Sequence, residues 1–564
     1  MTTGSLFTQL DMGKRALVAQ QSGMSTAGHN IANVDNESYS RQRVDLDPQH
    51  PVGSRFGAGV DLTGVERVTD GFLTRRVIGE QSRLGNTELR EENLRRLEAL
   101  FAEVEGFGLR DAFNDFWGAW GRLAAAPEAE IRRQDLLDSS QKLANRINGM
   151  HGDFTQVRKE LNGRLAERVD KVNQLAGRIA ELNMGIQQTD RGAGEANDLR
   201  DAREGALKEL SRLVQIDWYE NKDRVVNVSV AGGFPLVHGR KVNPLEASFD
   251  HEETGYFSLK GIDPQGITRD LTRLLHTGEL KELVTLRDDV VVGYIDRLNE
   301  LASELAFRVN SQHNAGTGLN ATYDKLTSSF ALKVDALNRP LPFLKDGLFR
   351  MHLVGKDNDL VESYEVELKA GEDTVADIVG RINATVARPD LLEARVNQDG
   401  SVTIEAKGAY DFVLGEDETD FSALMGFNNF FENLQGAADF RINPRLKEKP
   451  NLISTGSGLL PGDNTIALAI NQLQFEPTMN GESITFDEFY NGMLAELGLM
   501  INRSQEDVKN QRLIVDQFQK LRDEVSSVNM DEEVADMVQF QRGFEAAAKF
   551  VSTIDQMTQT VIDM

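Results

Sequence analysis

The feature that most constrains the fold is a heptad-spaced apolar stripe at each end of the chain. A stripe of this kind predicts a helix that buries one narrow seam against another helix. At the N-terminal end, with Gly13 and Gln20 filling two gaps, it runs through Leu6, Leu10, Leu17, Met24, Ala27, Ile31 and Val34. At the C-terminal end it runs through Met537, Phe540, Phe544, Ala547, Val551, Ile554, Thr558 and Val561. The two stripes predict either that the chain ends converge in one coiled coil or that each end packs on its own helical domain.

Between the ends, helical and β periodicities alternate. Three-and-four spacing marks residues 154–188 and 280–312, whereas period-two spacing marks residues 226–230 and 364–368. We therefore predict an α+β multidomain fold, with terminal helices forming a coiled coil, a central helical bundle and inserted β-rich outer domains. The expected segments are an N-terminal coiled-coil segment (1–45), a helical domain in three parts (46–213, 269–328 and 484–528), a small β insertion (214–268), a β-rich outer domain (329–420), a connector (421–483) and a C-terminal coiled-coil segment (529–564).

Composition removes several classes of function. Lys and Arg total 62 against 89 Asp and Glu, a net charge of −27 with no basic stripe, so nucleic acid is not an expected partner. With no cysteine, the chain has no disulfide, Cys-ligated metal or Cys nucleophile. The sequence lacks an apolar run of ~18 residues and an N-terminal secretory pattern. We expect no membrane insertion, and any export to use another route.

No motif amounts to an active site. The eight histidines never share a helix face, and two glycine-rich fragments (316–318 and 456–458) are interpreted as turns. The acidic residues Asp417, Glu418 and Asp420 could bind calcium or act as paired carboxylates, but a solvated loop is the preferred interpretation. Phe116, Trp117 and Trp120 are interpreted as helix–helix core. We predict no catalytic, cofactor-binding or metal-binding residues, and no enzyme activity.

Two terminal motifs carry a resemblance to a known family. Asn30-Ile31-Ala32-Asn33-Val34, followed by Tyr39-Ser40-Arg41-Gln42, resembles the N-terminal signature of the bacterial flagellar axial proteins, and its ending resembles the hook–filament junction (FlgK) family among them. Support comes from residues 196–201, 227–237 and 278–313, and from the C-terminal run 528–533 continuing to Asp555. At residues 36–38, Asn-Glu-Ser replaces the family's usual turn, so the loop geometry is not carried over.

The resemblance implies a structural subunit that forms a ring joining hook to filament and permits flagellin to assemble. It implies self-association, hook protein on one side, the second junction protein on the other, and an export chaperone at the C-terminal helix. The implied location is the extracellular flagellum, reached without a cleaved signal peptide. The alternatives are another axial protein (hook protein, second junction protein or flagellin), an unrelated helical fibre or adhesin subunit, and a glycan-acting enzyme. The expected polymerisation interface comprises Leu6, Leu10, Leu17, Met24, Asn30, Ile31, Asn33, Tyr39, Arg41, Gln42, Met537, Phe540, Phe544, Ala547, Val551, Ile554 and Val561.

Overall fold

The computed structural model describes the chain except for residues 1–2, 37, 50–56, 58, 102–107, 190–195, 251–254, 264, 320, 338, 358, 434–435, 459–461 and 563–564. The chain folds into two compact units, each of which is described by itself. Unit 1 comprises Met1–Asn93, Lys159–Asp289 and Ile501–Met564, and unit 2 comprises Leu94–Arg158 and Val290–Met500. The helices α2 (Gly71–Leu100), α4 (Glu130–Thr189) and α14 (Phe486–Ser526) contribute residues to both units.

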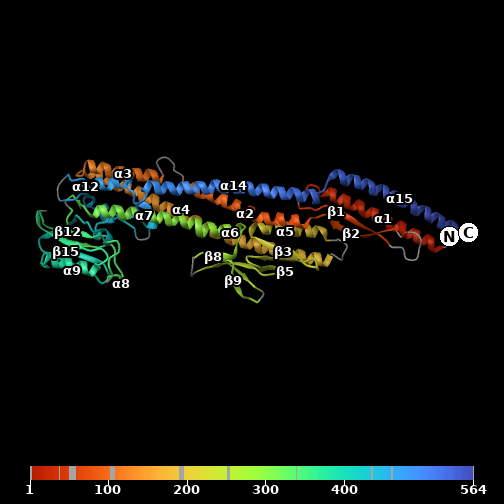
Figure 1. Ribbon diagram of the computed structural model, residues 1–564, viewed down its shortest axis with the longest axis horizontal. Helices are drawn as coiled ribbons and strands as arrows, with labels where there is room; N and C mark the ends of the chain where they lie inside the picture. The colour runs from red at the N-terminus through yellow and green to blue at the C-terminus, as the bar shows by residue number, and fades with distance from the viewer. Residues whose placement is uncertain are drawn as a thin grey trace. The chain divides into compact units, whose positions relative to one another are not determined.

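In unit 1 the two ends of the chain form a pair of helices. Helix α1 (Thr3–Ala32) lies beside α15 (Met530–Ile562), and both chain termini lie at the same end of the pair (Figure 1). The helices run antiparallel, since Asn30 contacts Glu533 and Gly23 faces Phe540. The strands β1 (Gln42–Pro48) and β2 (Val60–Arg67) form an antiparallel hairpin that packs on α1. The convergence of the termini is therefore observed, as a helix pair within one subunit.

The rest of unit 1 combines long helices with two small antiparallel sheets. One sheet has the strand order β3-β4-β5-β6 and the other β7-β8-β9. The strands are β3 (Ile216–Glu220), β4 (Val226–Val230), β5 (Phe234–His238), β6 (Lys241–Val242), β7 (Leu245–Phe249), β8 (Phe257–Ile262) and β9 (Thr268–Asp270). The further helices are α5 (Asn197–Leu213), the short η1 (Thr272–Leu274), α6 (Glu279–Thr285) and the π-helical η2 (Leu286–Val290). The period-two pattern predicted at residues 226–230 is strand β4 of this region.

The helical part of unit 2 is organised around aromatic residues. Helix α3 (Leu109–Ala125) buries Phe116, Trp117 and Trp120, which confirms their interpretation as core. Phe116 and Trp120 both contact Phe430, at ring-centroid distances of 6.4 and 5.2 Å. The other elements around them are α7 (Val291–Asn314), β17 (Phe431–Glu432), η3 (Gly436–Ala438), β18 (Arg441–Ile442), α11 (Pro444–Glu448), η4 (Pro450–Leu452), α12 (Thr465–Gln472), η5 (Leu473–Phe475) and α13 (Met479–Glu482).

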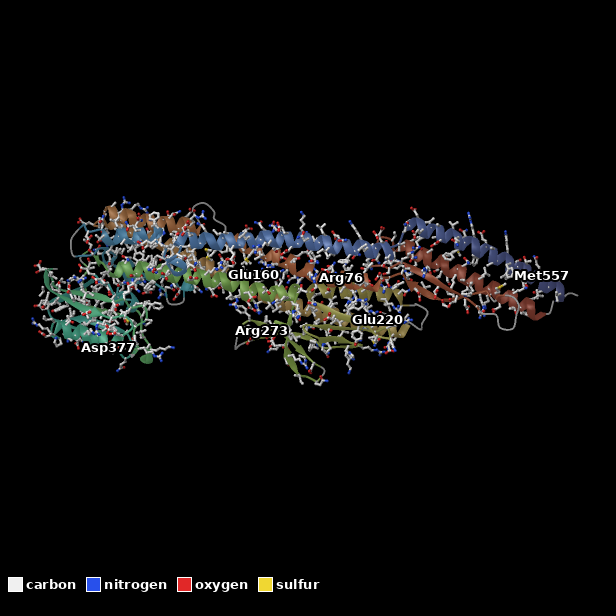
Figure 2. All side chains as sticks on the ribbon, in the orientation of Figure 1. Arg76, Glu160, Glu220, Arg273, Asp377 and Met557 are labelled. Carbon is white, nitrogen blue, oxygen red and sulfur yellow. The ribbon has the colours of Figure 1, made fainter. Side chains whose placement is uncertain are left out.

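The β-rich region of unit 2 has its own hydrophobic core. Two three-stranded antiparallel sheets, with orders β13-β12-β16 and β11-β15-β14, are joined by packing against α9. Thr374 and Asp377 form a capping box at the start of α9. Asp377 is labelled in Figure 2. The core extends from Leu326 to Phe427, slightly beyond the expected bounds of 329–420. The elements are β11 (Lys325–Thr327), α8 (Val334–Leu337), β12 (Gly347–Gly355), β13 (Leu360–Leu368), α9 (Val375–Val386), β14 (Leu392–Val396), β15 (Val402–Ala406), β16 (Tyr410–Gly415) and α10 (Phe421–Met425).

One local prediction is wrong in part and another is wrong. The glycine-rich fragments, expected to be turns, pair in part: Thr317 and Gly318 form β10, which pairs with β19 (Ser454–Gly456), whereas Gly316, Ser457 and Gly458 lie outside these strands. Asp417 and Asp420, expected in a solvated loop, are only 5% and 4% exposed. Asp417 accepts hydrogen bonds from the backbone N–H groups of Thr419 and Ser422, which offset the cost of burying a carboxylate.

No helix in the described part of the chain combines the length and the apolar character that a membrane span requires.

Candidate functional site

The side chain of Asn30, near the end of α1, joins three segments of unit 1. Its amide N–H groups donate to the carbonyl of Gln42 at 2.8 Å and to the carboxylate of Glu533 at 2.9 Å. Its carbonyl oxygen accepts from the hydroxyl of Tyr39 at 2.7 Å and from the backbone N–H of Gln42 at 3.0 Å. All four hydrogen-bonding positions of this buried amide are thus satisfied. These partners require a side chain that both donates and accepts hydrogen bonds. A carboxylate cannot donate and an aliphatic side chain can do neither, so only an amide fits.

Arg41 connects the N-terminal signature to the start of α15. Its guanidinium contacts Glu533 at 2.7 Å, Glu532 at 2.8 Å and Asp536 at 3.5 Å. Its backbone N–H donates to the carbonyl of Ser526, the last residue of α14, at 2.8 Å. Residue 41 therefore lies at the break between α14 and α15 and holds the acidic first turns of α15.

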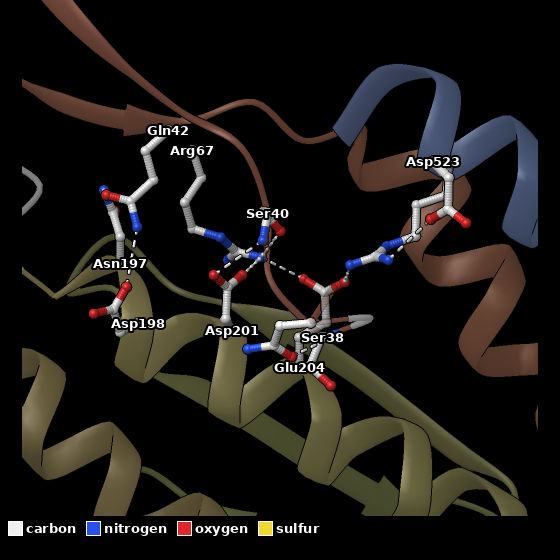
Figure 3. Close-up of polar contacts among 11 residues, drawn as sticks. Ser38, Ser40, Gln42, Arg67, Asn197, Asp198, Asp201, Glu204 and Asp523 are labelled. Carbon is white, nitrogen blue, oxygen red and sulfur yellow. Dashed lines mark hydrogen bonds and ion pairs between the residues drawn. The ribbon is translucent and has the colours of Figure 1, made fainter. Parts of the chain in front are cut away.

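On the other side, the same signature contacts α5. The side chain of Gln42 donates to the carboxylate of Asp198 at 3.0 Å, and Asn197 donates to the carbonyl of Val65 in β2 at 2.8 Å. Figure 3 shows Gln42 next to Asn197 and Asp198 at the beginning of α5. The 30–42 and 196–201 motifs, more than a hundred residues apart in the sequence, thus meet in space.

Arg67, at the end of β2, forms a nearby ion-pair cluster with α5. Its guanidinium lies 2.7 Å from Asp201 and 2.6 Å from Glu204, and it also donates to the hydroxyl of Ser40 (Figure 3). The backbone N–H of Ser40 donates to Asp201 at 3.2 Å. Arg522 of α14 lies 3.3 Å from Glu204, so this cluster links β2, α5 and α14.

Burial and acidic neighbours perturb the ionisation of two groups here. Burial raises the pKa of the Tyr39 phenol, and the nearby carboxylates of Asp198, Asp201 and Glu533 raise it further. Tyr39 is therefore a hydrogen-bond donor at any physiological pH. Burial also raises the pKa of Asp201, while Arg67 and the hydrogen bonds from Ser40 act in the opposite direction.

We call this set the terminal clamp. Its members are Asn30, Tyr39, Ser40, Arg41, Gln42, Arg67, Asn197, Asp198, Asp201, Glu204 and Glu533. Its side chains are amides, carboxylates, arginines and hydroxyls that are paired with one another. Within the described ranges no group of three or more His, Asp or Glu side chains could hold a metal ion. What this arrangement can do is fix the directions of α1, α5, α14 and α15 relative to one another.

Beyond the clamp, α1 and α15 approach closely at glycines. A Cβ atom added to Gly23 would lie 2.5 Å from ring carbons of Phe540, and one added to Gly13 would lie 2.6 Å from a methyl group of Val551. Such distances are well inside van der Waals contact, so the helix axes are close because these residues have no side chain. Gly13 and Gly23 are buried, and so are Leu6, Ala19 and Ala27.

The predicted interface residues fall into two groups. The polar members make their contacts within the chain itself. Asn30, Tyr39 and Gln42 are buried, Arg41 forms an ion pair with Glu533, and the side chain of Asn33 donates to the carbonyl of His29. The apolar members lie along the α1–α15 pair: Ile554 and Leu6 are buried, Leu10, Leu17, Met24, Ile31, Met537, Phe540, Phe544, Ala547 and Val551 are half-buried, and Val561 is 41% exposed. Their contacts with other subunits stay a prediction.

Sequence reasoning missed several residues of the site. Arg67 and Glu204 have no local signal, because their partners are distant in sequence, whereas Glu533 lies in the run 528–533 that supports the resemblance but carries no predicted role there. Gly13 entered the predicted stripe only as a gap and Gly23 lies outside it, although the position of a glycine on a heptad seam is itself a signal of close helix approach.

Comparisons with known proteins show what the chain resembles. Residues 94–326 match the family described as "Flagellar hook-associated protein FlgK helical domain", and residues 522–564 match "Flagellar basal body rod FlgEFG protein C-terminal". Flagellar hook-associated protein 1 of Escherichia coli K12 is 23% identical over 97% of this chain and 98% of its own length. The proteins of the same name from Salmonella typhimurium and Bacillus subtilis are each 24% identical, over 97% and 99% of this chain and 98% of their own lengths.

A solved structure supports the fold. The flagellar hook junction protein FlgK of Burkholderia pseudomallei matches with a TM-score of 0.52 and 14% identity, over 80% of this chain and the whole of that chain. The sequence matches cover 98% of each of these relatives, and the helical-domain match includes α4, α5 and α7. The chain is therefore similar over nearly its whole length to flagellar hook-associated protein 1, and over residues 94–326 to the FlgK helical domain family.

Proposed function

We propose that the chain is a structural subunit of the bacterial flagellum that forms the junction ring between hook and filament and permits flagellin to assemble. The observation that carries this proposal is the antiparallel pairing of α1 and α15 from opposite ends of the chain, with the terminal clamp at its base. Relatives covering nearly the whole chain are named flagellar hook-associated protein 1, which supports the same role. Self-association would use the terminal helices as a coiled coil.

The outer surface of α15 supports a role in assembly. Helix α1 covers only one side of α15, and six large apolar residues of α15 are 38–47% exposed. They are Met530, Val534, Val538, Phe550, Met557 and Val561. Repeated exposed apolar residues on one long helix are typical of a surface that other chains cover. Neighbouring subunits in a ring would bury them together with the predicted interface residues.

The proposed partners follow from the same role. They are hook protein on one side, the second junction protein on the other, and an export chaperone that covers the C-terminal helix before assembly. The chain would reach the extracellular end of the flagellum without a cleaved signal peptide. The remaining domain boundaries, including the outer β domain at 329–420, belong to this proposal. A different flagellar axial protein is the second candidate, because residues 522–564 match a model described for flagellar basal body rod FlgEFG proteins.

Electron microscopy of cells that lack the gene tests the function. We expect hooks without filaments and flagellin released into the medium, with filaments restored by the intact gene. A double variant, Phe540→Ala with Phe544→Ala, should fail to restore filaments, whereas Glu545→Ala, on the exposed side of the same helix, should restore them. Normal filaments in the deleted strain would contradict the proposal. Gold labelling of the chain along the hook or along the filament, instead of at their junction, would favour the second candidate.

A further inference from the structure

Unit 1 carries a groove whose basic character contrasts with the rest of the chain. A cavity of about 320 Å³ lies between the first turns of α2 and the beginning of β3. Its lining includes Arg75, Arg76 and Arg83, with Glu80 and Asp217 as the acidic members. Three arginines against two carboxylates give a local charge of +1 in a chain whose net charge is −27. We call this cavity the arginine groove.

The pairing inside the arginine groove leaves cationic groups available. Glu80 is buried, and its carboxylate is shared by Arg83 at 3.3 Å, Arg76 at 3.9 Å and the side-chain amide of Gln511 at 2.9 Å. Arg76, labelled in Figure 2, also lies over the ring of Phe518 at 5.1 Å. Arg75 is exposed and has no ion-pair partner among the residues that the structure describes. Arg76 and Arg83 therefore share the Glu80 carboxylate, and Arg75 has no carboxylate partner among the described residues.

Apolar surface lies in and beside the arginine groove; Phe72 is beside the cavity and is not part of its lining. Phe72 is 60% exposed and precedes Arg75 and Arg76 by three and four residues, which places the three side chains on one face of α2. Trp218 of β3 is half-buried in the opposite wall. A partner that fits this groove therefore combines apolar side chains with carboxylates.

The outer face of α14 in unit 1 has this combination. Leu513, Ile514, Leu521 and Val525 are 60%, 38%, 38% and 42% exposed. Leu513 lies one heptad after Glu506, and Ile514 and Leu521 continue the heptad row that begins at Asp507. Glu524 and Val525 lie 11 residues, about three helical turns, after Leu513 and Ile514, on the same side of the helix.

The carboxylates on this face of α14 are free for a partner. Glu506, Asp507 and Glu524 are exposed and have no ion-pair partner within the described part of the chain, although Arg503 and Lys520 lie at the rim. We call this surface the α14 ridge. Its apolar and acidic residues complement the apolar and cationic side chains at the arginine groove.

We propose that the α14 ridge of one copy of this chain docks in the arginine groove of the next copy. Since two different surfaces of the same chain meet, the contact is heterologous, and repetition of such a contact builds a closed ring or a helical array. Carboxylates of the α14 ridge approach Arg75 and Arg83, while Ile514 and Leu521 cover Phe72 and Trp218. The inference rests on the proposed function, because it assigns a side-by-side contact within the proposed ring. This contact is additional to the one made by the terminal helices.

Cysteine cross-linking tests the contact directly, because the natural chain has no cysteine. Two full-length variants, Phe72→Cys and Leu521→Cys, are expressed together in cells that lack the natural gene, and isolated flagella are treated with a short thiol-reactive cross-linker. We expect a dimer that contains one chain of each kind. A matched control replaces Phe72→Cys by Glu246→Cys, which is exposed on β7 and outside both surfaces, and should give no dimer.

Charge exchange provides a second readout. Arg75→Glu with Arg83→Glu should lower cross-linking several-fold, and adding Glu506→Lys with Asp507→Lys should restore it. Equal cross-linking for Phe72→Cys and Glu246→Cys, or no restoration by the second charge pair, would overturn the inference. If filaments form and the chain is at the junction while the dimer is absent, the inference is wrong and the proposed function stands. If the chain is absent from isolated flagella, both are wrong.

Discussion

The close approach of α1 and α15 at Gly23 leads to a prediction with a built-in control. Gly23→Ala adds a methyl group that would lie 2.5 Å from two ring carbons of Phe540 and 2.7 Å from a third, at the base of the ring. Because the base of the ring cannot swing away without a rotamer change, the helices must separate or Phe540 must leave the seam. Gly28→Ala, five residues later in the same helix, meets nothing within 4 Å.

The magnitude follows from two opposing terms. Replacing glycine by alanine inside a helix stabilises it by about 1 kcal/mol, and this gain is the same in both variants. Overpacking a well-packed contact costs about 1–3 kcal/mol, and this cost applies to Gly23→Ala alone. The difference between the variants is therefore about 1–3 kcal/mol, with helix propensity cancelled.

Hydrogen exchange on the full chain measures this difference locally. Amides of α1 and α15 should exchange about 5- to 150-fold faster in Gly23→Ala than in Gly28→Ala, since 1.4 kcal/mol corresponds to a factor of ten. Amides in the unit 1 part of α4 should be the same in both variants. Equal exchange of α1 and α15 in the two variants would refute the reasoning, because it would mean that Gly23 does not face a packed ring.

Three further predictions concern other parts of the molecule. Asn30→Asp removes both amide donors and places a carboxylate beside that of Glu533, so α15 should exchange faster, whereas Asn33→Asp, just after α1, should leave α15 unchanged by the same measurement. Burial raises the pKa of the Glu282 carboxyl from 4.5 to about 7. The protonated side chain therefore adds to the free energy of unfolding fully below pH 4.5, and this addition, about 3 kcal/mol, is lost as the pH rises through 7. In urea unfolding, Glu282→Gln should not show this pH-dependent loss of stability. Deleting residues 330–414 leaves core residues such as Phe421 uncovered and should cause aggregation, whereas deleting 323–427 with a short linker should keep a cooperative helical transition by circular dichroism.

Periodicity predicted the helices because it is a local property of the sequence. The α15 stripe is the clearest example: Met537, Phe540, Phe544, Ala547 and Val551 are all less exposed than their neighbours on the outer side of the helix. The capping box at Thr374 was predictable as well, since both of its partners lie within four residues.

Residues whose role depends on distant partners could not be placed in the same way. Asp417 and Asp420 have the sequence appearance of a solvated acidic loop, yet burial and local hydrogen bonds place them inside unit 2. Arg133 is fully buried and donates to the carbonyls of Pro127 and Ile453, the second of which lies 320 residues away. No spacing rule connects such residues, because the contact exists only after the chain has folded.

The terminal clamp and the apolar seam between α1 and α15 together determine the register of the two helices. A heptad seam alone allows two helices to slip by seven residues, about 10 Å, with apolar residues still in contact. In the observed register Asn30 lies beside Glu533 and Gly23 beside Phe540. A slip of one heptad would place Phe540 opposite Ala16 or Asn30, where a side chain replaces the glycine. The same slip would separate the Asn30 amide from Glu533 and leave buried hydrogen-bonding groups without partners, each at a cost of about 1–3 kcal/mol. Polar groups at the base and glycines along the seam thus select one register from several that apolar contact alone would permit, and a subunit that must present the same outer surface to each neighbour requires that selection.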